Sequence, residues 1–185
     1  MISKQKLEGA GIVSVLSAAT TIPYSILVII AAGREGSDGL SDFLLVMVDV
    51  VLMFMWLYYI VVFRKLLNIK ASFFEVNSLI KSMILMSFAL IAFDIMSLFG
   101  SVAEDLFGFL SMFAVVAYSI VYIIFGLKLK HCQDNLYGHL NLLSILIIIT
   151  GIFTASIILL PLALITSVIS SIVFAQIFFK AAKEF

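Results

Sequence analysis

The chain of 185 residues is 64% hydrophobic and only 12% charged, with a mean hydropathy of +1.26. Soluble domains are closer to half apolar and a quarter charged, because a folded domain keeps a wettable surface. Basic and acidic side chains balance at eleven each, so there is no overall basic field for nucleic acid. A single cysteine excludes an intramolecular disulfide framework. The composition therefore predicts an integral membrane protein whose main surroundings are the lipid bilayer.

Charged residues divide the chain into five apolar runs, and Pro161 divides the last of these into two, which gives six predicted spans. Runs of about 18 or more residues cross the ~30 Å hydrocarbon core, and in lipid they form helices because every backbone polar group needs an internal partner. We therefore predict an all-α fold, a polytopic integral membrane helix bundle with six transmembrane helices in a single domain, residues 1–185. The predicted spans are about 9–32, 43–63, 79–100, 106–127, 141–159 and 162–179.

Three local signals refine these spans. Pro23 predicts a kink in the first span, and Pro161 predicts a tight turn over residues 159–162 between the last two, because proline lacks a backbone donor. Ser72 and Glu75 have the spacing of a capping box, which predicts a helix that starts near 72–78 in the membrane interface and continues into the third span.

The basic residues predict the orientation. Cytoplasmic segments of membrane proteins carry an excess of lysine and arginine. Only Arg34 falls on one side of the six spans, together with acidic residues such as Glu104 and Asp105. The other side carries Lys4, Lys6, Arg64, Lys65, Lys70, Lys81, Lys128, Lys130, Lys180 and Lys183. We predict a multi-pass protein of the cell (inner) membrane with the N-terminus and the C-terminus both cytoplasmic.

Two carboxylates fall within the predicted spans. An ionisable side chain inside the bilayer costs on the order of 3 kcal/mol, so it indicates a partner or a function. Asp49 lies about 10 Å and Asp94 about 9 Å from the outer face, at 1.5 Å per helical residue. Their spans are consecutive and antiparallel, so the two carboxylates can face each other. Apart from Lys81, at the cytoplasmic edge of the third span, no lysine, arginine or histidine lies within the spans to neutralise them.

Polar neighbours share helix faces with these aspartates. Ser87 and Ser97 fall on the Asp94 face of the third span, and Tyr118 lies on a polar stripe of the fourth. One interpretation is a protonatable or cation-binding site reached from outside, since close carboxylates in a low dielectric share a proton or bind a cation. The other is that each aspartate is protonated and hydrogen-bonded, and only holds the bundle together.

Small residues recur at helical spacing on two spans. Such series let helix backbones approach closely, which is the main source of helix association in lipid. They indicate packing within the chain, a homo-oligomer, or contact with a membrane partner protein. The residues are Ala10, Ser14 and Ala18 on the first span, and Ala163, Ser167, Ser171 and Ala175 on the last.

Enzyme and cofactor motifs are absent from the sequence. There is no HExxH, GxSxG or phosphate-binding glycine loop, and His131, Cys132 and His139 do not match a zinc spacing. We expect no enzyme activity, no metal site and no cofactor, and we interpret Trp56, Tyr58 and Tyr59 as interfacial anchors. Two functions remain: a small cation- or proton-linked transporter or channel subunit using Asp49 and Asp94, or a non-catalytic scaffold that docks a partner through its small-residue faces.

Overall fold

The structure, a computed structural model, describes residues 2–32, 39–99, 101–132, 134, 136–156 and 158–184. These residues form six α-helices and one short 3-10 turn, and no β-strand occurs among them. The all-α prediction is confirmed. The elements are α1 (Lys4–Ala32), α2 (Gly39–Lys70), α3 (Asn77–Ser97), α4 (Ser101–Lys130), η1 (Leu136–Gly138), α5 (Leu140–Ala155) and α6 (Leu160–Ala182). The predicted outer-loop residues Arg34, Glu35 and Asp38 lie outside the described residues.

Five helices are long and apolar enough to cross a membrane, namely α1, α2, α3, α4 and α6. Helix α5 is also apolar but has only 16 residues, so it is about 24 Å long. It ends at Ala155, earlier than the predicted 159, and α6 begins at Leu160. The described helices are compatible with a multi-pass membrane protein.

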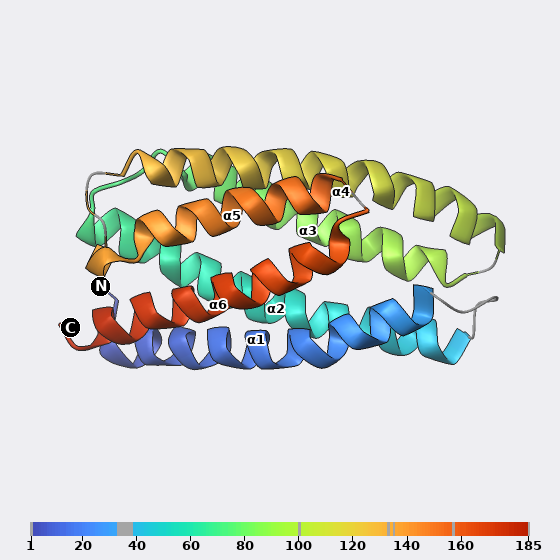
Figure 1. The fold of residues 1–185 in the computed structure, drawn as a ribbon, viewed down its shortest axis with the longest axis horizontal. Helices are drawn as coiled ribbons and strands as arrows, with labels where there is room; N and C mark the ends of the chain where they lie inside the picture. Colours follow the sequence, from blue (N-terminus) through green and yellow to red (C-terminus); the bar gives the residue numbers. More distant parts are fainter. Residues whose placement is uncertain are drawn as a thin grey trace.

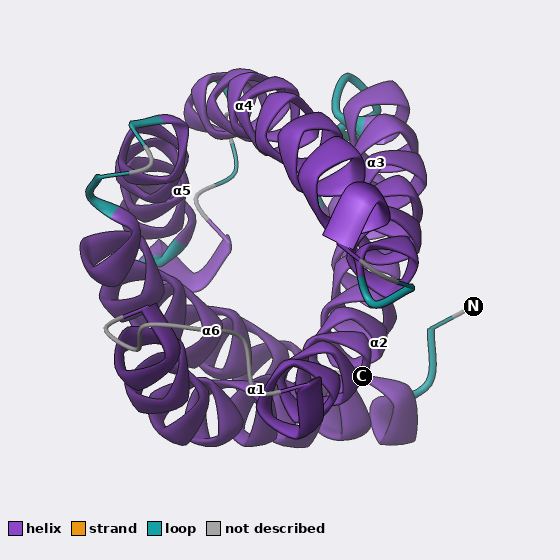
Figure 2. Cartoon of the chain, turned by 90° about the vertical axis from the view of Figure 1, so that its right-hand side faces the viewer, coloured by secondary structure: helices purple, strands orange, loops and turns teal. Residues whose placement is uncertain are grey.

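The six helices form a closed ring (Figure 2). Each helix packs against its neighbours in the sequence, and α6 closes the ring by packing along α1. Both chain ends lie at the same end of the bundle, which we call the terminal end; the opposite end is the far end (Figure 1). A ring of this kind leaves an axis onto which every helix can direct side chains.

The two prolines occupy different positions in their helices. Pro23 lies inside α1, which continues to Ala32 and bends in its second half (Figure 1). Proline removes one helical hydrogen bond and displaces the carbonyl four residues earlier, which accounts for a bend without a break. Pro161 does not lie in the turn itself, as predicted, but in the first turn of α6. The first helical amides have no partner within the helix, so proline costs little there.

The capping-box prediction at Ser72 and Glu75 is wrong. Helix α3 begins at Asn77, and its N-cap position, Val76, makes no side-chain capping bond. Ser72 instead adopts a positive φ of 50° just after α2, and the amide of Phe73 donates to the carbonyl of Leu67. The segment therefore ends one helix rather than starting the next, and no helix begins at 72.

The core of the ring lies at its terminal end. Phe63, Phe125, Phe174 and Phe178 are fully buried there, together with Ile177 and other aliphatic side chains from all the helices. The Phe63 ring stands edge-on to Phe174 at 4.9 Å and to Phe178 at 6.3 Å between centroids. We call the four phenylalanines the aromatic plug. They belong to the buried core between the terminal end and the middle of the bundle.

Helices α4 and α5 approach closely through glycine. A Cβ atom at Gly151 would lie 2.6 Å from Ile123 Cγ1 and 3.2 Å from the backbone oxygen of Ser119. We expect Gly151→Ala to lower the free energy of unfolding by about 1–3 kcal/mol, because the helices have to separate to admit the methyl group. Thermal unfolding of the purified protein in detergent measures the change.

Gly108 provides the control on the same pair of helices. It lies in α4, and a Cβ atom there would meet nothing within 4 Å. Gly108→Ala should therefore be neutral or stabilise the protein by up to about 1 kcal/mol through helix propensity. Equal effects of the two substitutions would contradict the close approach at Gly151.

A polar network fastens the end of α6 to the terminal end of the ring. Glu184 Oε2 accepts from Lys70 Nζ at 2.6 Å and from the Tyr137 hydroxyl at 3.0 Å. Lys180 Nζ lies 2.7 Å from His139 Nε2. These hydrogen bonds, first that from Lys70 and then that from Tyr137, hold the pKa of Glu184 below its ordinary value. Burial, and then the Glu184 carboxylate, raise the pKa of Tyr137 to about 12.

The lowered pKa of Glu184 predicts a pH-dependent contribution to stability. A carboxylate whose pKa falls on folding stabilises the folded state above its unfolded pKa, and this contribution is lost as pH falls through the folded pKa. We expect Glu184→Gln to lower the melting temperature slightly at pH 7, and the difference from the parent to shrink as pH falls below the ordinary glutamate pKa of 4.5 and to vanish once pH has passed the lowered pKa of Glu184. A difference that persists at low pH would show that the contact acts through packing instead of charge.

Candidate functional site

A cavity of about 320 Å³ lies within the ring, on the far side of the aromatic plug. Its lining comes from α1, α2, α3, α4 and α6, so five of the six helices contribute. Hydroxyl groups, aromatic rings, aliphatic side chains and two carboxylates share its surface. Among the lining residues that the structure describes there is no lysine, arginine or histidine. The cavity therefore combines acidic and hydroxyl groups with apolar side chains, whereas the outer faces of the helices carry exposed leucine, isoleucine and phenylalanine.

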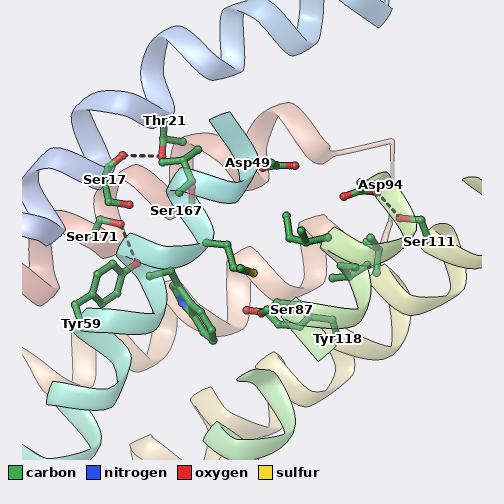
Figure 3. A pocket seen from close by; sticks show the side chains of 16 residues that line it. Ser17, Thr21, Asp49, Tyr59, Ser87, Asp94, Ser111, Tyr118, Ser167 and Ser171 are labelled. Carbon is green, nitrogen blue, oxygen red and sulfur yellow. Dashed lines mark hydrogen bonds between the residues drawn. The ribbon is translucent and has the colours of Figure 1, made fainter. Parts of the chain in front are cut away.

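The two carboxylates belong to Asp49 of α2 and Asp94 of α3. Both line the cavity, and in Figure 3 their oxygens point toward one another across it. The hydroxyl of Ser111, on α4, donates to Asp94 Oδ1 at 3.1 Å. Tyr24, on α1, places its hydroxyl next to the Asp49 carboxylate. Neighbouring helices thus contact both aspartates, and both carboxylates line the cavity.

The other predicted site residues are only partly brought together. Ser87 and Tyr118 line the same cavity. The Ser87 hydroxyl also donates to the carbonyl of Met83 at 2.9 Å. Ser97 is not part of the lining: its hydroxyl donates to the backbone oxygen of Asp94 at 2.7 Å. Ser97 therefore contacts the Asp94 backbone within α3 and not its carboxylate.

Trp56 and Tyr59 do not lie where the sequence interpretation put them. Both face the cavity instead of the membrane interface, and Tyr59 is buried, with its hydroxyl 3.5 Å from Ser171 Oγ. The signal for Trp56 was present in the sequence, because it follows Asp49 by seven residues and so shares its helix face. For Tyr24 no such signal existed, because its partner Asp49 lies on another helix.

A second cavity of about 180 Å³ continues from the first toward α5. Trp56, Tyr59 and Tyr118 line both spaces and form the wall between them. The Trp56 and Tyr118 rings are arranged edge to face with centroids 6.3 Å apart. Phe174 of the aromatic plug lines the second cavity and packs against Tyr59 at 5.2 Å. The sequence of features along the axis is therefore carboxylates, aromatic wall, second cavity and plug.

The small residues of α1 and α6 lie at the closure of the ring. These helices form an extensive interface, and the Ser14 hydroxyl donates to the carbonyl of Ala10. Ser167 and Ser171 also line the cavity with their hydroxyl groups. Six of the seven predicted residues are buried, namely Ala10, Ser14, Ala18, Ala163, Ser171 and Ala175. Packing within the chain accounts for their spacing.

Neither a metal site among the described residues nor a known relative suggests a further function for this cavity. Within the part of the chain that the structure describes, no group of three or more histidine, cysteine, aspartate or glutamate side chains is placed to hold a metal ion. His139 contacts Lys180, and the Cys132 thiol donates to the carbonyl of Asp134 at 3.5 Å. In comparisons with known proteins, no family model, no curated protein and no solved structure matches the chain.

Proposed function

We propose that this protein is a cation- or proton-linked transporter or channel subunit of the cell membrane, and that Asp49 and Asp94 bind the transported ion. The observation that carries the proposal is the opposition of two carboxylates across an interior cavity with no described basic side chain in its lining. Two nearby carboxylates in a low dielectric favour a shared proton or a bound cation, because either reduces their repulsion. Cation or proton binding is therefore the chemistry that we propose for this site.

The proposed topology has six spans with both termini in the cytoplasm. Figure 1 supports an even number of crossings, because the two chain ends lie together and α5 runs alongside the longer helices of the ring. Basic residues are concentrated near the terminal end, for example Arg64, Lys128 and Lys180, which favours a cytoplasmic location of that end. The aspartates then lie on the outer side of the aromatic plug, and a cation reaches them from outside.

The alternative function, a scaffold that docks a partner through small-residue faces, receives less support. Those faces on α1 and α6 are largely buried inside the ring, so they offer little surface to a second protein. A scaffold also gives no reason for two carboxylates to face an aromatic-lined cavity. We therefore prefer transport as the function.

Flux measurements in proteoliposomes test the proposal. The purified protein is reconstituted, and the movement of protons, Na⁺, K⁺ and choline is followed for the parent and for Asp49→Asn and Asp94→Asn. The proposal is supported if the parent transports one of these cations and if each substitution abolishes that transport. Parent and variants that are all indistinguishable from empty liposomes would contradict it.

A further inference from the structure

We propose that the ligand of the cavity is a small organic cation, an ammonium group that carries an apolar body. This inference rests on the proposed function, since it names the class of cation that the same site binds. The ammonium group lies between the Asp49 and Asp94 carboxylates, and the body lies against Trp56 and Tyr118. Four properties of the cavity lead to this assignment: its volume, its aromatic wall, its apolar lining and its small number of strong ligands.

The volume fits a small molecule better than a single ion. Ligand pockets have volumes of about 300–1,000 Å³, and this cavity of about 320 Å³ is at the lower end of that range. One water occupies about 30 Å³ of liquid, so the space corresponds to roughly ten waters. An ion that is bound directly by two carboxylates fills only a fraction of it.

The aromatic wall supplies the second property. The face of a tryptophan or tyrosine ring attracts a cation within about 6 Å, and quaternary ammonium groups are recognised in this way. Trp56, Tyr59 and Tyr118 line the cavity, and Figure 3 shows Tyr59 and Tyr118 apart from the two aspartates. Tyr118 is fixed by stacking on Tyr122, with the ring centroids 5.8 Å apart, and by its contact with Trp56. The rings are therefore positioned before a ligand arrives.

The remaining lining is apolar and is suited to the uncharged part of such a ligand. Leu52 and Met53 of α2, Leu90 and Ile91 of α3, and Val115 of α4 lie between the carboxylates and the rings. A hydrated inorganic ion gains nothing from aliphatic walls, whereas a methyl or methylene group loses its contact with water there. The lining is thus matched to a cation with hydrocarbon attached.

The strong ligands are too few for a divalent metal ion. Calcium takes six to eight oxygen ligands, and magnesium requires near-octahedral coordination. The described lining offers two carboxylates, and no third histidine, cysteine or acidic side chain of the described residues joins them. Two carboxylates suffice for an ammonium group, which forms charge-assisted hydrogen bonds or, when quaternary, purely electrostatic contacts.

Trp56 makes the test direct, because it is the only tryptophan of the chain and lies in the cavity wall. The intrinsic fluorescence of the purified protein in detergent is titrated with choline and with benzyltrimethylammonium. The neutral isostere of choline, 3,3-dimethylbutan-1-ol, is the ligand control, and NaCl at equal ionic strength is the salt control. We expect a saturable change with the two ammonium compounds and none with the alcohol or the salt.

Matched variants locate the binding. Asp49→Asn and Asp94→Asn should each weaken the apparent Kd at least about 10-fold, since each removes a charge that faces the ligand. Tyr118→Leu should weaken it about 3- to 30-fold, whereas Tyr118→Phe keeps the ring and should bind nearly as the parent does. Asp105→Asn removes an exposed charge of α4 that does not line the cavity, and it should leave the Kd unchanged.

The outcomes separate this inference from the proposed function. The melting temperature is scanned in parallel with Na⁺, K⁺ and pH, because a ligand that binds only the folded state raises it. A rise with an inorganic cation or with protonation that needs Asp49 and Asp94, without any response to the ammonium compounds, overturns the inference and leaves the proposed function standing. Equal binding of the neutral alcohol also overturns it. No response to any cation or to pH overturns both.

Discussion

Asparagine at position 49 or 94 is expected to lower cation flux in proteoliposomes by at least about 100-fold. Two unit charges 4 Å apart interact by about 4 kcal/mol at an effective dielectric constant of 20, and 1.4 kcal/mol corresponds to a factor of ten. Removal of one carboxylate therefore removes most of the stabilisation of a cation in the cavity. The substitution preserves the shape of the side chain, so the hydrogen bond from Ser111 to position 94 can still form.

The double substitution distinguishes one shared site from two independent residues. If Asp49 and Asp94 hold the same cation, the double variant transports no worse than either single variant, because the effects of residues that act as a unit are not additive. Asp105→Asn is the control for surface charge at the same end of the bundle and should transport like the parent. Parent-like flux in either single variant would contradict the proposed role of Asp49 and Asp94 in binding the cation.

The second large effect is expected at the aromatic plug. Phe174 is 1% exposed, lies 4.9 Å from Phe63 and 5.2 Å from Tyr59 between ring centroids, and forms the floor of the second cavity. Phe174→Ala should cost about 3–5 kcal/mol of stability through loss of packing. It should also raise uncoupled cation leak through the reconstituted protein, because the removed ring separates the cavities from the terminal end.

Two further variants distinguish a leak caused by loss of the Phe174 ring from a leak caused by general loss of stability. Phe174→Leu keeps most of the volume, so we expect a modest loss of stability and little leak. Phe109→Ala removes a ring of α4 that is 60% exposed, and we expect a small effect on both properties. Leak is measured as the dissipation of a pH gradient in liposomes. A Phe174→Ala protein that folds and leaks no more than the Phe109→Ala protein would show that the plug does not close the path.

Most of the helical architecture follows from local features of the chain. Long apolar runs have one stable form in lipid, so charge boundaries locate the helices to within a few residues. The errors occur where local patterns compete. Ser72 and Glu75 match a capping box, but the chain after Lys70 uses a positive φ at Ser72 to end α2. Pro161 breaks the last apolar stretch, yet it sits in the first turn of α6 and not in the turn before it.

The candidate site was accessible to sequence reasoning only in part. Asp49 and Asp94 stand out because a carboxylate in an apolar run is costly, and that signal is independent of the fold. Ser97 shares a helix face with Asp94, but it bonds the Asp94 backbone and does not line the cavity. Trp56 and Tyr59 were assigned to an interface because aromatic residues near a helix end commonly anchor there. The neighbouring helices place them in the interior instead.

The sequence by itself determined that the chain is all-α, apolar enough for a membrane, and supplied with two carboxylates inside apolar runs. These properties depend on composition and on periodicity along one helix. The tertiary structure alone decided that α6 packs along α1 to close the ring, and that most of the small residues are buried by this packing. It also decided that the aspartates share a cavity with Trp56 and Tyr118. The physical reason is that helical periodicity defines a face of each helix, whereas only packing decides which other face it meets.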